Sequence, residues 1–260
     1  MSKPMVFRGF NLQSEPYKVT FEEGLFNSPL KDIILYELAR SDNAVAVYRR
    51  YKSREFTLGG HIKTDSSDSL EAAIDALKAA LLLQSGELAV GWAGGTRYFE
   101  AECANLNINR RNTELDHSGW SAQFVMPVPF STDGVTRDFI TAVSGHTLAT
   151  LQVGVNNIGT YLAYPFITLV ITALEPNTSN VTFTFTNPAT SENISITDEF
   201  ADGDTITLDT LNKQIFRGSE LLAGVGNFPA WQPGSGLLEL SDTATSRTIS
   251  LSATYIARYL

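Results

Sequence analysis

The feature that most constrains the fold of this chain is a series of short, turn-bounded apolar segments in its second half. The segments are rich in threonine and β-branched residues, and turns such as Glu175-Pro176-Asn177 and Asp202-Gly203 separate them. No segment with helical periodicity interrupts the series. Short strands with regular turns are typical of a β-sandwich, so this half predicts a sandwich of the jelly-roll type. The predicted strands cover residues 147–155, 166–171, 181–186, 194–197, 205–209, 215–217, 237–240 and 248–255.

The first half differs because it contains one clear amphipathic helix, over residues 68–84. Apolar residues recur there at spacings of four, three and four positions, which places on one helix face Leu70, Ile74, Leu77 and Leu81. Asp68 followed by Glu71 has the form of a capping box. Gly86 can adopt the left-handed conformation that closes a helix, so both ends of the helix are predicted as well.

Segments with period-two alternation flank this helix and predict an antiparallel sheet. They are enriched in β-branched and aromatic residues and cover residues 45–50, 55–63, 87–92, 97–108 and 120–126. Gly94-Gly95 lies between two of these segments and predicts a hairpin turn, because glycine tolerates positive φ. One helix on an antiparallel sheet makes the first half an α+β domain, in a chain that is mainly β.

The junction between the halves follows from proline and from the loss of periodicity. Pro127 and Pro129 lack the N–H that a ladder needs, so the last strand of the first half ends there. Residues 130–145 show no strong periodicity and predict the crossing between two domains. A chain of 260 residues is long for one domain and short for three. We therefore expect an N-terminal domain over residues 1–140 and a C-terminal β-sandwich domain over residues 141–260.

Composition excludes two kinds of partner. The formal net charge is -9, whereas binding to a nucleic-acid backbone needs clustered lysine and arginine, so no nucleic acid is expected. The N-terminus does not have the pattern of a signal peptide, and the longest apolar stretch, residues 167–174, is too short to span a membrane. We therefore expect no membrane partner either. The single cysteine, Cys103, cannot form an internal disulfide, and the sequence leaves open whether it is buried.

The inventory of reactive side chains argues against an enzyme. Only His61, His117 and His146 are available as histidine bases, and none lies in a recognisable nucleophile motif. One cysteine and scattered histidines cannot form a zinc site, and the acidic run at residues 198–204 lacks the spacing of a calcium-binding loop. The sequence therefore predicts no catalytic residue, no cofactor and no metal site.

Aromatic residues in the second half leave one binding role open. Trp231 and Phe228, together with Tyr161 and Tyr164, lie in or near predicted loops, where aromatic rings could stack on a sugar. The alternative for the same residues is a half-buried position in the core or in an interface. A carbohydrate-binding or adhesin module that uses the C-terminal sandwich is therefore the second functional hypothesis.

Several motifs, taken in order along the chain, carry a family resemblance. In the first half they are Gly24-Leu25, YKSREFTLGG at 51–60, GTRYFEA at 95–101 and GWSAQF at 119–124. In the second half they are YPFI at 164–167, LDT at 208–210 and FPAWQPG at 228–234. With the Pro129-Phe130 junction between the halves, their order and spacing resemble those of the distal tail (Dit) proteins of siphophages, which are long-tailed bacteriophages.

The resemblance implies an N-terminal domain with a helix and an extended hairpin, followed by a galectin-like C-terminal sandwich. It also implies a non-enzymatic structural protein of the virion, which forms a homo-hexameric ring at the tail tip or baseplate. Such a ring joins the tail tube protein to tail-tip, tail-associated or receptor-binding proteins. We expect the N-terminal domains to form the ring, with residues 45–63 and 97–108 as candidate contacts, because edge strands can continue a sheet across subunits.

Overall fold

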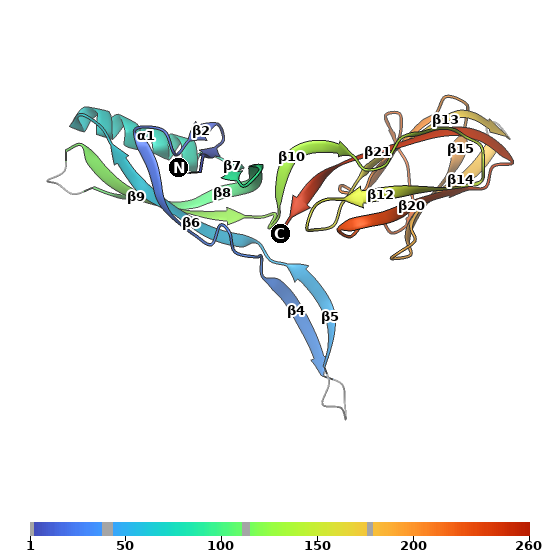
Figure 1. Ribbon diagram of the computed structural model, residues 1–260, viewed down its shortest axis with the longest axis horizontal. Helices are drawn as coiled ribbons and strands as arrows, with labels where there is room; N and C mark the ends of the chain where they lie inside the picture. The colour runs from blue at the N-terminus through green and yellow to red at the C-terminus, as the bar shows by residue number, and fades with distance from the viewer. Residues whose placement is uncertain (1–2, 38–43, 111–114, 176–178) are drawn as a thin grey trace. The chain divides into compact units, whose positions relative to one another are not determined.

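The computed structural model describes residues 3–37, 44–110, 115–175 and 179–260. These residues form antiparallel β-sheets and, within those ranges, a single α-helix, α1 (Ser67–Leu82) (Figure 1). The predicted fold class, mainly β with one helix in the first half, is confirmed. The chain divides into two compact units, residues 1–133 with Leu260 and residues 134–259. A domain limit at residue 140 stays a prediction.

The N-terminal unit is built on a four-stranded antiparallel sheet with the order β3-β6-β9-β8. The long strand β8 also belongs to a second group of strands, because its residues 95–101 pair with β7 and its residues 102–109 pair with β9. β7 pairs in turn with β1, which pairs with β2. The bounds of these strands are β1 (Met5–Phe7), β2 (Phe10–Asn11), β3 (Tyr17–Glu23), β6 (Arg54–Lys63), β7 (Gly86–Trp92), β8 (Gly95–Asn109) and β9 (His117–Met126).

Strand predictions in this unit are confirmed for β6, β7, β8 and β9, whose bounds extend the predicted segments by a few residues. The hairpin turn between β7 and β8 is confirmed as well, with Gly94 at a φ of 88° that an L side chain rarely adopts. Strand β3 was not predicted. A bulge between Val19 and Phe21 breaks its alternation, which removes the period-two signal.

Helix α1 packs its predicted apolar stripe into the core of the N-terminal unit. The buried positions are Leu70, Ala73, Ile74, Leu77 and Leu81. They contact an interior in which the Phe56 and Phe124 rings stack with centroids 4.9 Å apart, and in which the Phe7 ring meets Phe124 edge-on. Tyr17 donates from its hydroxyl to the carbonyl of Ala73 at 2.9 Å, so β3 is joined directly to the helix. Burial raises the pKa of this phenol.

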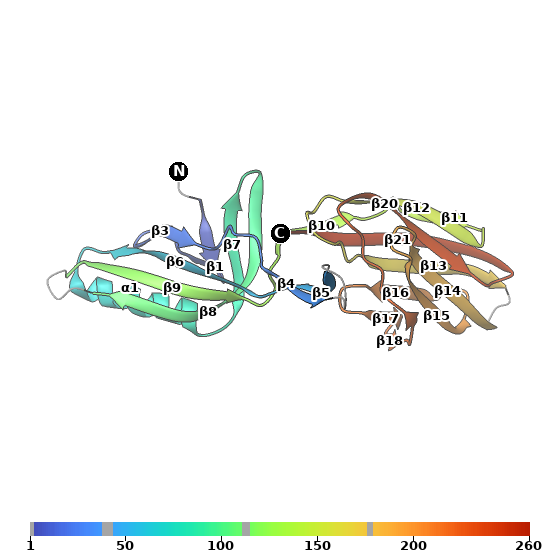
Figure 2. The ribbon, with the colours of Figure 1, turned by 90° about the horizontal axis from the view of Figure 1, so that it is seen from below.

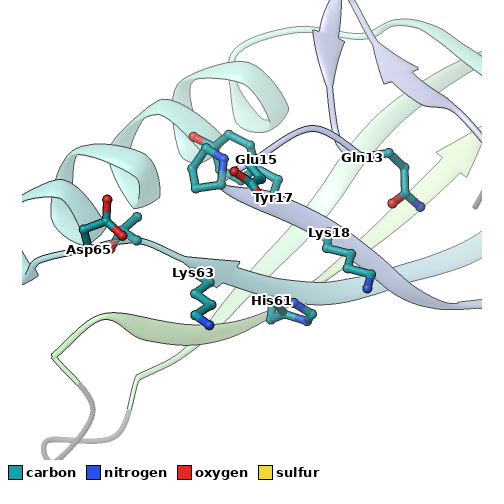
Figure 3. Close-up of a pocket in the computed structure, with 9 residues that line it drawn as sticks. Gln13, Glu15, Tyr17, Lys18, His61, Lys63 and Asp65 are labelled. Carbon is teal, nitrogen blue, oxygen red and sulfur yellow. The ribbon is translucent and has the colours of Figure 1, made fainter.

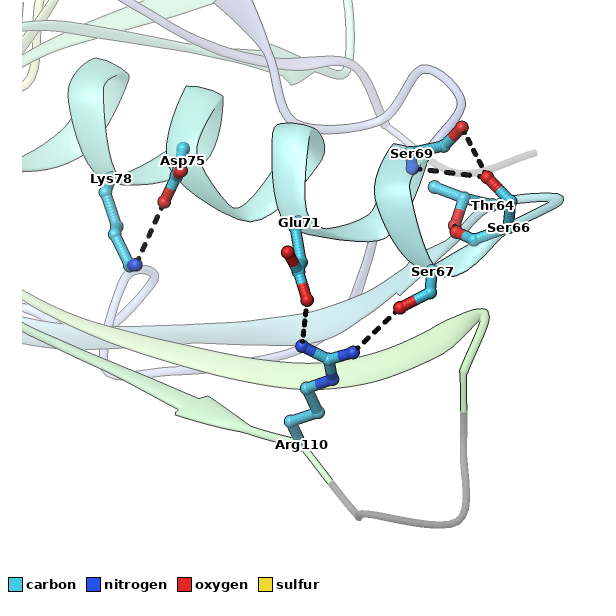
Figure 4. A network of polar contacts seen from close by, with 8 residues as sticks. All are labelled: Thr64, Ser66, Ser67, Ser69, Glu71, Asp75, Lys78 and Arg110. Carbon is cyan, nitrogen blue, oxygen red and sulfur yellow. Dashed lines mark hydrogen bonds and ion pairs between the residues drawn. The ribbon is translucent and has the colours of Figure 1, made fainter.

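Both predicted helix ends are wrong by a few residues. The N-cap is Ser66, whose Oγ accepts a hydrogen bond from the backbone N–H of Ser69 at 3.2 Å, so Asp68 lies in the first turn instead (Figure 4). There the negative charge of Asp68 interacts favourably with the positive end of the helix dipole. At the other end the cap is Leu83 in the right-handed region, and Gly86 begins β7. In the described part of the chain, no helix is long and apolar enough to cross a membrane.

The end of β8 is connected to the start of the helix by a polar network (Figure 4). The guanidinium of Arg110 lies 2.9 Å from Oε1 of Glu71 and donates to Oγ of Ser67 at 3.1 Å. Both contacts are exposed, so each contributes little to the stability of the fold. Their effect is to fix the position of the strand end against the first helix turn.

The C-terminal unit is a β-sandwich of two antiparallel sheets. One sheet has the order β12-β20-β14-β15-β19 and the other contains β18-β17-β16-β13-β21, with β11 also paired to β21. Figure 2 shows these strands from a second direction. Their bounds are β11 (Val143–His146), β12 (Thr150–Asn157), β13 (Phe166–Glu175), β14 (Ser179–Asn187), β15 (Glu192–Phe200), β16 (Thr205–Asp209), β17 (Gln214–Arg217), β18 (Glu220–Leu221), β19 (Val225–Gly226), β20 (Gly234–Asp242) and β21 (Ser246–Tyr259).

The two sheets share one apolar core. Alternate residues of each strand point inward, and the buried side chains come from both sheets, among them Ile167, Leu169, Phe183, Phe185, Leu208, Leu238, Leu240 and Leu251. The predicted strands of this half are confirmed in order and position, and so is a β-sandwich. A galectin-like arrangement in particular stays a prediction.

The prediction of an irregular crossing over residues 130–145 is wrong in its local structure. Residues 130–145 contain β10 (Ser131–Asp138) and part of β11. After Ser131, β10 is largely exposed on both faces, and this exposure explains why residues 130–145 show no period-two pattern. Phe139 follows it and is 2% exposed, in the core of the sandwich.

A buried ion pair lies at the turn between β20 and β21. Arg247 and Asp242 approach to 2.7 Å, and their side chains are only 5% and 1% exposed. The same guanidinium donates to the carbonyl of Ala244, and Asp242 accepts from the backbone N–H of Ala244 at 2.9 Å. Removing one partner of such a pair leaves the other charge buried without compensation.

We predict that Arg247→Met lowers the free energy of unfolding by about 3–5 kcal/mol, because Asp242 then stays buried and unpaired. Lys78→Met is the control, since its ion pair with Asp75 is exposed and contributes less than about 1 kcal/mol. Urea denaturation followed by near-ultraviolet circular dichroism measures both. Equal losses in the two variants would contradict the assignment.

Candidate assembly interface

A two-stranded ribbon stands apart from the other strands of the N-terminal unit. Strands β4 (Lys31–Glu37) and β5 (Ala44–Tyr51) pair with each other, and no further strand of the described residues pairs with either (Figure 1). The strand predicted at residues 45–50 is confirmed as β5, and the extended hairpin that the family resemblance implied is present. Strand β4 itself was missed by the sequence analysis.

The side chains of β4 from residue 33 to residue 36 are apolar and exposed. Ile33, Ile34, Leu35 and Tyr36 are 50%, 45%, 63% and 58% exposed. Successive residues of a strand point to opposite faces, so this consecutive run places apolar area on both faces of the ribbon. An isolated two-stranded hairpin is at best marginally stable in water, and exposed contiguous apolar area marks an interaction site. The ribbon therefore has the character of a surface that is buried in an assembly.

The base of the ribbon is anchored to the rest of the unit. The rings of Tyr51 and Phe130 meet edge-on at 5.4 Å, and the ammonium of Lys31 lies 5.2 Å above the Tyr51 ring. Lys52 forms an ion pair with Asp32 at 3.4 Å. These contacts hold the start of β4 and the end of β5, so the apolar run beyond them is presented by a fixed base.

Two open strand edges accompany the ribbon. Within the described residues β3 pairs with β6 alone, and β8 over residues 102–109 pairs with β9 alone. The side chain of Gln13 donates to the Val19 carbonyl at 3.3 Å and covers one position of the β3 edge. The backbone N–H of Tyr17 at the start of β3 donates to the Ser14 carbonyl at 2.8 Å. Open strand edges of this kind can pair with another chain.

These edges correct one expectation. Residues 45–63 were expected to offer contacts, but residues 57–62 of β6 lie between β3 and β9 and are paired on both edges. Of residues 97–108, the part before residue 102 pairs with β7 and only the later part is open. The open strand on the opposite side is β3, which the sequence analysis missed.

One of the aromatic residues considered for sugar stacking, Trp231, lies in the interior. Trp231 is 2% exposed, its ring meets Phe139 edge-on at 5.2 Å, and its Nε1 donates to the Leu237 carbonyl at 2.9 Å. Amide side chains fix the same loop: Asn187 donates to the Ala230 carbonyl at 2.7 Å and Asn157 to that of Trp231 at 3.1 Å. The indole face is therefore covered by the sandwich core.

The other three aromatic residues keep some exposed area. Phe228 is half-buried against the core, and Tyr161 and Tyr164 are intermediate in exposure. The guanidinium of Arg258 lies 5.1 Å above the Tyr164 ring, and burial lowers the pKa of this guanidinium. Ligand stacking on Phe228 and Trp231 stays a prediction, and the burial of Trp231 leaves Phe228 as the accessible member of that pair.

The acidic run at residues 198–204 is engaged in local contacts. Asp202 accepts from the backbone N–H of Leu174 at 2.8 Å, Asp204 accepts from that of Ala201 at 2.9 Å, and Asp198 pairs with Arg217 at 3.3 Å. No group of three histidine, cysteine or acidic residues with metal-binding geometry occurs in the ranges that the structure covers. Cys103 is buried, and burial raises the pKa of its thiol.

Sequence comparisons identify no relative. No protein-family model matches the chain, and no curated protein matches it.

Solved structures do match. The fold is similar to that of the Dit protein (gp 19.1) of phage SPP1, described as a paradigm of the hub adsorption apparatus in phages that infect Gram-positive bacteria. The TM-score is 0.70 at 12% identity, over 100% of both chains. A chain of the phage P2 baseplate in its activated conformation is a more distant match, with a TM-score of 0.49 and 8% identity over 98% of both chains. The likeness to a distal tail protein is thus confirmed at the level of the fold.

We predict that replacing two exposed ribbon residues, Ile34→Ser with Leu35→Ser, changes the free energy of unfolding by less than about 1 kcal/mol, because both side chains are largely in water already. The same variant should lose concentration-dependent self-association, measured by sedimentation velocity. Leu82→Ser with Leu83→Ser removes exposed apolar area from the helix end and is the matched control. A ribbon variant that associates as the unchanged protein does would exclude the ribbon as an interface.

Proposed function

We propose that this chain is a structural component of a bacteriophage tail tip or baseplate. In this proposal it forms a hexameric ring hub, located in the virion, that connects the tail tube to tip or receptor-binding proteins, and it catalyses no reaction. The observation that carries the proposal is the full-length fold match to the SPP1 hub protein, at a TM-score of 0.70. The ribbon and the two open edges support it, because each is a surface that suits assembly.

A ring of identical subunits needs two different surfaces that fit each other. Neighbouring strands in the order β3-β6-β9-β8 are antiparallel, so β3 and β8 run in opposite directions. The β8 edge of one copy can therefore continue the antiparallel sheet beside β3 of the next. Such a contact is heterologous, and it closes into a ring when the rotation between copies divides a full turn.

The ribbon supplies the apolar part of the contact. Full burial of a large aliphatic side chain contributes about 1.5–3 kcal/mol, and the four residues at 33–36 still expose roughly half of their area. Burying them against a neighbouring subunit offsets the entropy lost on association. In this proposal the backbone edges set the register of the ring, and the ribbon supplies affinity.

The C-terminal sandwich is proposed to face the partners of the ring. No specific observation favours a carbohydrate-binding module in its place, since the indole that would stack on a sugar is buried in the core.

The expected result is a ring with sixfold symmetry when the purified protein, alone or with its tail tube partner, is examined by negative-stain electron microscopy. Asn105→Lys with Asn107→Lys should abolish the ring, because lysine on an open edge opposes strand addition. The control is Gln123→Lys on β9, which carries the same change on the same sheet face, directly beside Asn105 but on a central strand. Loss of the ring in the control alone, or only monomers with every partner tried, would refute the proposal.

A further inference from the structure

A recess of about 480 Å³ lies where β3 begins and β6 ends. Its walls include Lys18, His61 and Lys63, and Figure 3 shows the two lysines on either side of the imidazole. Glu15 and Asp65 also line it and lie nearer to α1 in this view. The recess adjoins the open β3 edge described above, since Gln13 lines it and also covers one position of that edge.

Strand register brings four basic side chains onto one face of the sheet. Lys18 on β3 is directly opposite His61 on β6, and Lys63 on β6 is directly opposite His117 on β9. Residues 61 and 63 point to the same face because they are two apart on one strand. The rings of His61 and His117 lie with centroids 5.4 Å apart. The cluster therefore combines residues that are far apart in the sequence.

The backbone is shaped to bring these strands close together. A Cβ atom at Gly60 would lie 1.9 Å from the carbonyl oxygen of Lys18, so only glycine permits this approach of β3 to β6. Lys18 follows Tyr17, whose hydroxyl is hydrogen-bonded to helix α1. This bond holds the backbone next to Lys18 in place.

The cluster lacks the carboxylate partners that pair other basic residues in the protein. Lys52, Lys78, Arg110, Arg217 and Arg247 each form an ion pair with an aspartate or glutamate. Among the described residues, no aspartate or glutamate side chain lies within ion-pair distance of Lys18 or Lys63, even though Glu15 and Asp65 line the same recess. Two lysines and two histidines without a carboxylate partner form a local basic cluster in a chain with 28 acidic residues and 19 lysines and arginines.

The imidazole of His61 lies among other basic groups. Burial lowers the pKa of His61, and His117, Lys18 and Lys63 lower it further by repulsion. Of the other charged groups nearby, Arg110 just after β8 is paired with Glu71, while Glu15, Asp65 and Asp116 are carboxylates on the flanking loops. A metal ion is not a suitable occupant, because two ammonium groups would repel it. An anion relieves the repulsion instead.

We propose that this recess binds a tetrahedral oxyanion of the phosphate or sulfate type, held by the ammonium groups of Lys18 and Lys63 and by the imidazoles of His61 and His117. Two ammonium groups and the N–H groups of two imidazoles suit an anion with several oxygens better than a single carboxylate. The oxyanion can be a free ion or a group carried by a larger ligand.

Nuclear magnetic resonance of the histidine ring protons tests the proposal on the full-length protein. Inorganic phosphate and sulfate are titrated in separate experiments, with sodium chloride at matched ionic strength as the control. Saturable shifts of the His61 and His117 signals are expected with both oxyanions and not with chloride. A bound anion favours the charged imidazole, so the pKa of His61 should rise on binding, and affinity should be higher at about pH 6 than at about pH 8. Sulfate keeps its charge over this range. A change of sulfate affinity with pH therefore reports the protonation of the histidines and not that of the anion.

Substitutions localise the site. Lys18→Gln and Lys63→Gln should each weaken oxyanion binding by about three- to tenfold, because one exposed cation is removed from a set. Lys78→Gln, on the helix surface, should leave binding unchanged. The proposal is wrong if chloride gives the same shifts, if the three variants bind alike, or if zinc ions shift these signals and phosphate does not. A site for a free ion binds inorganic phosphate more tightly than dimethyl phosphate, whereas a site for the phosphodiester of a polymer binds both.

Discussion

The N-terminal unit depends on one long strand that serves two groups of strands at once. The 15 residues of β8 pair with β7 in their first half and with β9 in their second, and α1 covers the core that this arrangement encloses. Backbone pairing along β8 determines where the apolar faces meet, so the Phe56–Phe124 stack and the helix stripe share one interior. Among the residues that the structure describes, the same division leaves the second half of β8 without a partner strand on its other side. Core formation and an open edge are thus two results of one strand.

Much of this fold could be predicted from the sequence because its strongest signals are periodic. The helix stripe from Leu70 to Leu81 and the alternating strands of the sandwich are buried on one face, which gives a clear period. Strand β4 escaped prediction for the opposite reason, since Ile33 to Tyr36 are apolar at every position and exposed on both faces. The helix start was misplaced because Ser66 and Asp68 are both good caps, and only the backbone decides between them.

Prediction of sites was limited by cross-strand geometry. Trp231 could be recognised as a large aromatic residue in a loop, but its burial depends on Asn157 and Asn187, which lie on other strands. The basic cluster could not be seen either, because Lys18, His61 and His117 become neighbours only through the registers of β3, β6 and β9. Residue type and spacing along the chain carry no information about such registers.

The apolar ribbon has a consequence for the protein before it meets any partner. A free subunit with uncovered aliphatic side chains on a paired strand is prone to colloidal association with the wrong surfaces. The main opposition is the mutual repulsion of copies that each carry a net charge of -9. Salt screens that repulsion over a distance of about 8–10 Å at physiological ionic strength, whereas it leaves the apolar attraction intact. The acidity of the chain therefore opposes nonspecific association of copies through the apolar ribbon.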